Sequence, residues 1–299
     1  MNVAASTKPP GREPRGERRP SRWAILLAVA AGCTHVLREP RSLAPEGTPP
    51  ASPAASAPAL LAEAEASFAR RPDVAAVRRA DALFLEAARA DGSDVAGLLG
   101  SIRAKAWLIE HDEDAAVRRS LAGDAVDAGQ WCERRATGDA RCEYGLALAL
   151  GLQARETRSL GAVKVMIEHL RRASAGDPRL DFAGPARVLS LVLVKAPGWP
   201  MGPGDAEAGL REARRAVELF PDYPPNQLVL AEALMANGSA GAAKAAAARA
   251  LRLARARADA GDPDGPDWVK AAQKLAAPQP RAGRPEPAAS RHDAAAKVA

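Results

Sequence analysis

Apolar residues recur every three to four positions through the middle of the chain, from about residue 59 to residue 276. This spacing puts them on one face of an α-helix, whereas a half-buried strand would alternate apolar and polar residues. Turn-forming pairs such as Asp91-Gly92 and Asn237-Gly238 interrupt the pattern. We therefore expect helices over residues 59–70, 73–90, 93–110, 113–135, 140–155, 159–175, 183–195, 205–220, 225–237, 239–260 and 266–276.

Small residues repeat at a fixed distance near the end of this region. Gly209 and Ala216 are followed, 34 residues later, by Ala243 and Ala250. Small side chains let two helices approach closely, and helix pairs with a period near 34 are typical of tetratricopeptide repeats. The sequence predicts an all-α, tetratricopeptide-like helical-hairpin solenoid over residues 59–276. The alternative is an alanine-rich helical bundle in which this spacing arose by chance.

Composition agrees with a helical fold and argues against nucleic-acid binding. Alanine is abundant and aromatic residues make up only 4% of the chain, unlike a β-sandwich or barrel. The net charge of +6 lies at the two ends, because residues 1–32 carry +4 and residues 277–299 carry +2. The body between them is neutral, so the overall charge does not indicate a phosphate-binding surface.

The first 32 residues are typical of a bacterial signal peptide. A basic stretch ends at Arg22, and an apolar run of about ten residues follows, too short to span a bilayer. The run ends in Val29-Ala30-Ala31-Gly32-Cys33, which resembles a lipobox. The resemblance implies cleavage before Cys33 and lipidation of that cysteine, which would anchor the protein in a bacterial membrane. The alternatives are an incidental Cys33 with ordinary signal-peptidase cleavage, or a retained short anchor.

Two further segments lack the composition of a folded core. Residues 33–58 contain many prolines separated by alanine and serine, which favours an extended, disordered tether. Residues 277–299 have the same character and are expected to form a disordered tail.

The remaining cysteines, Cys132 and Cys142, lie on either side of a predicted helix–helix turn. An even number of cysteines in an oxidising compartment suggests a disulfide that staples this hairpin. The alternative is two independent buried thiols. A metal site at the cysteines is not expected, because no second cysteine pair or nearby histidine completes four ligands.

We find no catalytic constellation in the sequence. The run His111-Asp112-Glu113-Asp114 is better explained as a solvated turn whose acidic residues favour the start of the next helix. Phosphate-binding glycine loops, nucleophile elbows and HExxH motifs are absent from the sequence. We therefore expect no enzyme activity, no cofactor and no metal site.

Two segments resemble one known family. They are DFAGPARVLSLVLVKAPGWPMGPGD at 181–205 and AVELFPDYPPNQLVLAEALM at 216–235, and they look like the C-terminal half of TatT-like proteins, the tetratricopeptide lipoproteins associated with some TRAP transporters. The resemblance implies an all-helical periplasmic protein, a trimer with a pore, that contacts a solute-binding protein delivering small organic ligands. It covers residues 140–275 well and residues 59–135 only in helical layout.

The proline- and glycine-rich stretch from Lys195 to Asp205 should form an ordered connector, with Asp205 at a helix N-cap. We interpret Trp199 as a structural plug between hairpins, and the alternative is a binding role. Leu228, Glu232 and Met235, spaced by four and three, would share one helix face and are our candidates for a partner surface.

Two functional hypotheses follow. The first is a periplasmic binding component, lipid-anchored to the outer membrane in preference to the inner one, whose partners are other envelope proteins such as a solute-binding protein. The second is a structural scaffold of a cell-envelope or secretion assembly with no role in handling a solute. A homo-oligomer is compatible with either.

Overall fold

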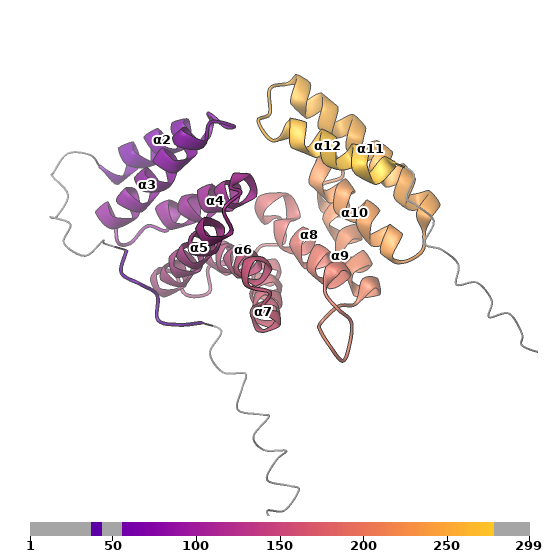
Figure 1. The fold of residues 1–299 in the computed structure, drawn as a ribbon, viewed down its shortest axis with the longest axis horizontal. Helices are drawn as coiled ribbons and strands as arrows, with labels where there is room; N and C mark the ends of the chain where they lie inside the picture. Colours follow the sequence, from indigo (N-terminus) through magenta and orange to yellow (C-terminus); the bar gives the residue numbers. More distant parts are fainter. Residues whose placement is uncertain (1–36, 44–55, 278–299) are drawn as a thin grey trace, which may run out of the picture. The chain divides into compact units, whose positions relative to one another are not determined.

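The computed structural model describes residues 37–43 and 56–277, and these residues form eleven α-helices. Figure 1 shows them following one another as hairpins from α2 in indigo to α12 in yellow. They are α2 (Ala57–Phe68), α3 (Val74–Ala90), α4 (Ala96–His111), α5 (Ala115–Arg135), α6 (Ala140–Thr157), α7 (Leu160–Gly176), α8 (Leu180–Lys195), α9 (Ala206–Leu219), α10 (Pro224–Ala236), α11 (Ala240–Asp259) and α12 (Gly265–Ala276). The prediction of an all-α fold is confirmed.

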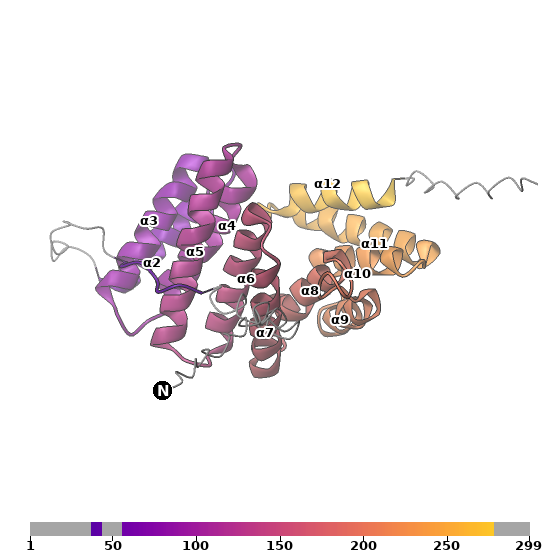
Figure 2. The same cartoon turned by 60° about the horizontal axis from the view of Figure 1, so that its bottom comes forward.

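The helices form two layers. Each helix packs against the next one along the chain (Figures 1 and 2). Each even-numbered helix also contacts the next even-numbered helix. Within the described ranges, the odd-numbered helices make no such contact with one another. The even-numbered helices therefore form one continuous layer, and the odd-numbered helices form the second. In such a solenoid each hairpin covers an apolar face of its neighbour.

Five helices begin with a side-chain cap. Asp73, Asp114, Asp139, Ser159 and Asp205 each accept a hydrogen bond from a backbone N–H in the first turn of the helix that follows. A cap of this kind stabilises a helix by about 1 kcal/mol. The predicted N-cap at Asp205 is confirmed. Every observed helix boundary lies within three residues of the predicted one.

Small residues lie where the helices cross. Ala243 and Ala250, which repeat Gly209 and Ala216 along the sequence, are both buried. A Cβ atom at Gly209 would lie 2.7 Å from Cγ2 of Val194, so a glycine lets α9 pack closely on α8. The predicted small positions thus set the distance between neighbouring helices.

Part of the predicted tether is docked on the helical domain, which corrects the expectation that all of residues 33–58 are disordered. The Arg41 guanidinium donates to Asp124 at 2.5 Å and to Asp127 at 2.7 Å, both on α5. The indole N–H of Trp131 donates to the Arg41 carbonyl at 2.8 Å. Pro40 is buried. The proline content predicted an extended segment, but it could not reveal carboxylates on α5 that hold it.

The predicted signal peptide, the lipidation site Cys33 and residues 278–299 of the predicted tail lie outside the described residues, so these predictions stay predictions. In the part of the chain that the structure describes, no helix combines the length and the apolar character that a membrane crossing requires.

Candidate protein-interaction surface

The connector between α8 and α9, Lys195–Asp205, is an ordered loop as predicted. The Gly204 amide donates to the Pro197 carbonyl at 2.8 Å, and the Met201 amide donates to the Gly198 carbonyl at 3.1 Å. These bonds tie the two arms of the loop together and form a turn at its tip. The loop is therefore closed by hydrogen bonds of its own backbone.

Two glycines allow this loop to close. A Cβ atom at Gly204 would overlap the carbonyl oxygen of Ala196, and a Cβ atom at Gly202 would overlap that of Pro197. Any residue other than glycine would force the backbone apart at either position. The shape of the loop therefore depends on these two residues.

Trp199 lies at the tip of the loop with 90% of its surface exposed, and Met201 beside it is 74% exposed. This corrects the interpretation of Trp199 as a structural plug. The expectation failed because a large apolar residue between two prolines was assumed to be buried. An exposed aromatic side chain on a backbone of fixed shape is typical of a residue that anchors a binding partner.

The three predicted surface residues of α10 have different environments. Leu228 is only 9% exposed and packs against Ala250 and Ala272, so it belongs to the core and not to a partner surface. Helix α12 covers it, which the spacing within α10 could not indicate. Met235 is 38% exposed. Burial therefore removes Leu228 from the predicted partner surface, while Met235 remains a candidate for it.

Glu232 connects α10 to the loop. Its carboxylate lies 2.8 Å from the Lys195 ammonium at the end of α8. Glu232 lies about one helical turn before Met235 on α10. We use the name interaction edge for Lys195, Trp199, Met201, Glu232 and Met235 together. The structure therefore links Glu232 and Met235 to the loop that carries Trp199, and it leaves Leu228 out.

A row of aromatic rings follows the opposite ends of the same helices. Phe182 stacks on Tyr223, with ring centroids 4.5 Å apart, and Tyr223 meets Trp268 edge-on at 5.6 Å. Phe220 contacts Phe182 edge-on at 5.5 Å. The apolar pattern did not predict this row, although Tyr223 lies in the Pro-Asp-Tyr-Pro stretch of the segment at 216–235. The rings join α8, α9, α10 and α12, and their packing stabilises these hairpins.

An unusual turn presents Phe182 to this row. Asp181, Phe182 and Ala183 have φ angles of 49°, 54° and 63°, which are left-handed. Such angles cost non-glycine residues roughly 1–2 kcal/mol each. The Arg187 guanidinium offsets this cost, because it donates to the carbonyls of Asp181 and Phe182 at 3.0 and 3.1 Å. It also bonds to the Asp181 carboxylate at 2.7 Å.

Asn226 completes the support of this turn from α10. It is fully buried, and its Oδ1 accepts from Arg187 at 3.2 Å while its amide donates to the Phe182 carbonyl at 3.1 Å. The hydroxyl of Tyr144 donates to the Asp181 carboxylate at 2.8 Å, and burial raises the pKa of Tyr144 well above its ordinary value. We call Arg187, Asp181, Asn226 and Tyr144 the turn network.

The other residues singled out in the sequence have structural surroundings. Cys132 and Cys142 form a disulfide across the turn between α5 and α6, with 5.2 Å between their Cα atoms. In the acidic run, Asp114 caps α5 and Asp112 pairs with Arg78 at 3.1 Å. His111 stacks on Trp107 with ring centroids 3.7 Å apart. The run is thus a capped turn.

A cavity of about 530 Å³ lies between α2, α4 and the turn before α12. Arg71 and Arg103 line it, but each has a carboxylate partner: Asp264 lies 3.3 Å from Arg71, and Glu65 lies 2.5 Å from Arg103. These pairs neutralise the arginines, so the cavity offers no excess of positive charge to an anionic ligand.

The chain was compared with known proteins. Its sequence matches no protein-family model and no curated protein. It does resemble solved structures. The crystal structure of TTC0263, a thermophilic tetratricopeptide-repeat (TPR) protein of Thermus thermophilus, is similar with a TM-score of 0.54 and 19% identity, covering 73% of this chain and 100% of that one. This likeness shows the TPR fold, so the predicted solenoid is confirmed.

Two crystal structures of MamA are also similar, each with a TM-score of 0.42. Their identities are 16% and 17%; they cover 68% and 62% of this chain, and 94% and 92% of the MamA chains.

Proposed function

We propose that this protein is a periplasmic, lipid-anchored TPR lipoprotein that binds another envelope protein through the interaction edge and catalyses no reaction itself. The observation that carries the proposal is the exposed Trp199 on a closed loop. A residue whose backbone is already held in place loses less conformational entropy when a partner covers it. Proteins with the TPR fold generally act as interaction scaffolds, which supports the same conclusion.

The location in the envelope rests on two features. The lipobox-like sequence ending at Cys33 supports export and lipidation, and the Cys132–Cys142 bridge suits an oxidising compartment. Because Glu39 pairs with Arg134 on α5 at 2.7 Å, the stretch of chain between Cys33 and this contact is short. At about 3.5 Å per residue it reaches roughly 20 Å, so a lipid on Cys33 would keep α5 close to the membrane.

The partner that the TatT-like segments suggest is a solute-binding protein of a TRAP-type transporter. Those segments contain Lys195, Trp199 and Met201 in the first and Glu232 and Met235 in the second, which together are the interaction edge. The second candidate is a structural scaffold of an envelope assembly with no solute role. The docking of Arg41 on α5 favours this candidate, because a lipoprotein that had to move to collect solutes would not need its tether fixed to the helical domain.

Site-specific photo-crosslinking tests the interaction edge in intact cells. A crosslinking amino acid at Met201 should capture an envelope protein, and the adduct should disappear when Trp199→Ala is added. The matched control places the same amino acid at Leu160, which is 44% exposed at the start of α7 and outside the edge. Equal adducts at both positions, or an adduct that persists with Trp199→Ala, would contradict the proposal.

The captured partner then separates the two candidates. A solute-binding protein whose own ligand changes the thermal stability of the co-purified complex supports the transport role. A partner that responds to no small molecule supports the scaffold. Lipidation is tested independently: the mature protein should carry acyl chains on Cys33, and Cys33→Ala should release the protein from membranes. An unmodified Cys33 in the purified protein would contradict this part.

A further inference from the structure

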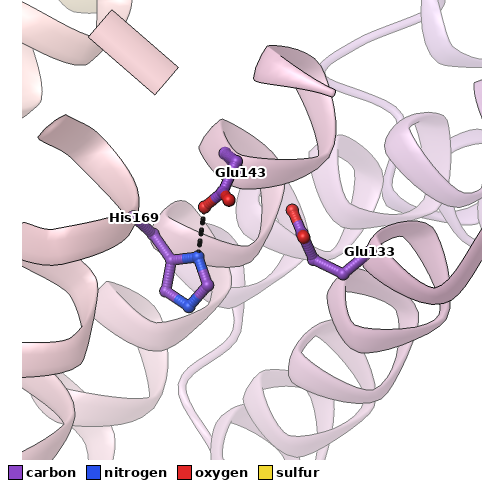
Figure 3. Close-up of side chains that lie close together, drawn as sticks. All are labelled: Glu133, Glu143 and His169. Carbon is purple, nitrogen blue, oxygen red and sulfur yellow. Dashed lines mark hydrogen bonds and ion pairs between the residues drawn. The ribbon is translucent and has the colours of Figure 1, made fainter. Parts of the chain in front are cut away.

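Three side chains of metal-ligand type meet between α5, α6 and α7. Glu133, Glu143 and His169 each place one ligand atom so that all three atoms lie within 4.8 Å of one another (Figure 3). Glu143 and His169 are buried, and Glu133 is partly buried. Sequence reasoning missed the group because its members are distributed over three helices and 36 residues. It lies in a different hairpin from the interaction edge and does not depend on the proposed function.

The disulfide positions the two carboxylates. Glu133 directly follows Cys132, and Glu143 directly follows Cys142. Because the bridged cysteines hold the end of α5 against the start of α6, the residues after them are also held side by side. The covalent link thus opposes the separation that two like charges would otherwise favour. His169 reaches the pair from α7, the next helix along the chain.

The protein's own groups satisfy this cluster incompletely. Glu143 lies 2.5 Å from Nδ1 of His169, and a guanidinium nitrogen of Arg172 lies 2.7 Å from the same Nδ1. One ring nitrogen cannot donate to a carboxylate and accept from a guanidinium at the same time. Oε1 of Glu133 is buried and has no hydrogen-bond partner. An unpaired buried acceptor of this kind is costly.

The charges leave room for a further cation. Two carboxylates, those of Glu133 and Glu143, face one guanidinium. This guanidinium belongs to Arg172, which donates to Glu143 at 2.8 Å. The neutral form of the His169 imidazole offers a nitrogen lone pair of the kind that binds a metal. Arg172 is itself 49% exposed at its side chain, so it can move out into solvent.

We propose that Glu133, Glu143 and His169 bind a divalent transition-metal ion of the Zn²⁺ class, and that Arg172 acts as their counter-ion when it is not displaced by the metal. Two carboxylate oxygens and one imidazole nitrogen suit such an ion, whereas Ca²⁺ and Mg²⁺ prefer oxygen ligands throughout. Bound to residues of α5, α6 and α7, the ion would join two successive hairpins beyond the reach of the disulfide.

The test uses the purified, oxidised full-length protein and Zn²⁺ as the probe, with affinity measured by competition against a chromophoric chelator. The expected result is one Zn²⁺ per chain. Glu133→Gln and His169→Ala should each weaken binding by tenfold or more, consistent with losing a ligand. The matched control is Glu218→Gln, which removes the same charge from an exposed position on α9, away from the cluster, and should leave the affinity unchanged.

Arg172 provides the sharpest prediction. Arg172→Gln removes the competing cation, so Zn²⁺ should bind more tightly than to the unchanged protein. Substituting Co²⁺ should give the visible absorption of a site with nitrogen and oxygen ligands, and His169→Ala should alter that spectrum. Circular dichroism confirms that each variant is folded. Absence of stoichiometric binding, an affinity that Glu133→Gln and His169→Ala leave unchanged, or weaker binding in Arg172→Gln would each overturn the proposal.

Discussion

The hairpins around α5–α7 and those around α8–α10 are held together in different ways. In the first region a disulfide and a buried pair, Glu143 with His169, connect successive helices. In the second, stacked aromatic rings and the turn network connect them. Both regions bury polar groups, but the second also projects Trp199 into solvent. The comparison shows that the residues that hold the helices together can be different from the residues that are exposed for binding.

The largest expected effect comes from breaking the turn network. Arg187→Ala would remove the guanidinium that donates to the left-handed turn, leave Oδ1 of Asn226 without this donor, and leave the Asp181 carboxylate with Tyr144 but without its charged partner. Removing one member of a buried charged pair typically costs about 3–5 kcal/mol, and partial exposure of Asp181 favours the lower end. Urea unfolding measures the loss. Arg214→Ala on the exposed face of α9 is the control and should change stability little; equal losses would contradict this role for the network.

Removing the disulfide should have the next largest effect. The double substitution Cys132→Ser with Cys142→Ser should lower the free energy of unfolding by about 2–3 kcal/mol, because the loop that the bridge closes is short. Thermal unfolding of the variant and of the oxidised parent, under identical conditions, gives the difference. The comparison between regions predicts that crosslinking at Met201 survives this change, and its loss would show that the regions are not separate.

A smaller effect is expected at the loop. Gly204→Ala would force the backbone away from Ala196 and should cost roughly 1–3 kcal/mol, while leaving Trp199 itself unchanged. Partner crosslinking should fall as strongly as with Trp199→Ala. Gly241→Ala on α11 is the control, since no atom lies within 4 Å of the added Cβ. If Gly204→Ala retains full crosslinking, the closed shape of the loop is unimportant for binding.

The smallest effect is a loss of stability in alkali. Burial raises the pKa of Tyr223 to about 12, above its ordinary value of 10.0. Above pH 10 the unfolded chain therefore loses this proton first, so stability falls as the pH rises from 10 towards 12. At pH 10.5 the loss from Tyr223 should be less than about 1 kcal/mol. Absorbance at 295 nm should show that neither Tyr144 nor Tyr223 ionises at pH 10 in the folded protein. If each were half-ionised at this pH, neither would be buried as described.

The sequence was sufficient for the fold, because helix positions follow from local signals. Apolar periodicity marks the buried faces, and aspartates such as Asp139 and Asp205 mark the starts of helices. It was insufficient for features that depend on contacts between hairpins. Leu228 is covered by α12, and the left-handed turn at Asp181 contains no glycine that would have signalled it.

The candidate sites divide in the same way. Trp199, Glu232 and Met235 could be selected from their residue types and spacing, although the exposure of Trp199 was misjudged. The cluster of Glu133, Glu143 and His169 could not, because nothing in the sequence indicates which faces of α5, α6 and α7 meet.

Helix α12 has a consequence for the behaviour of the protein in concentrated solution. It has no second helix of its own in the described residues, yet its Ala272 covers Leu228 and Ala250 at the end of the last hairpin. A chain truncated before Gly265 would expose at its end the same kind of apolar face that joins one repeat to the next. Copies could then add head to tail without closing into a ring, which is the route to open filaments. By covering this apolar face, α12 removes a surface through which copies could associate.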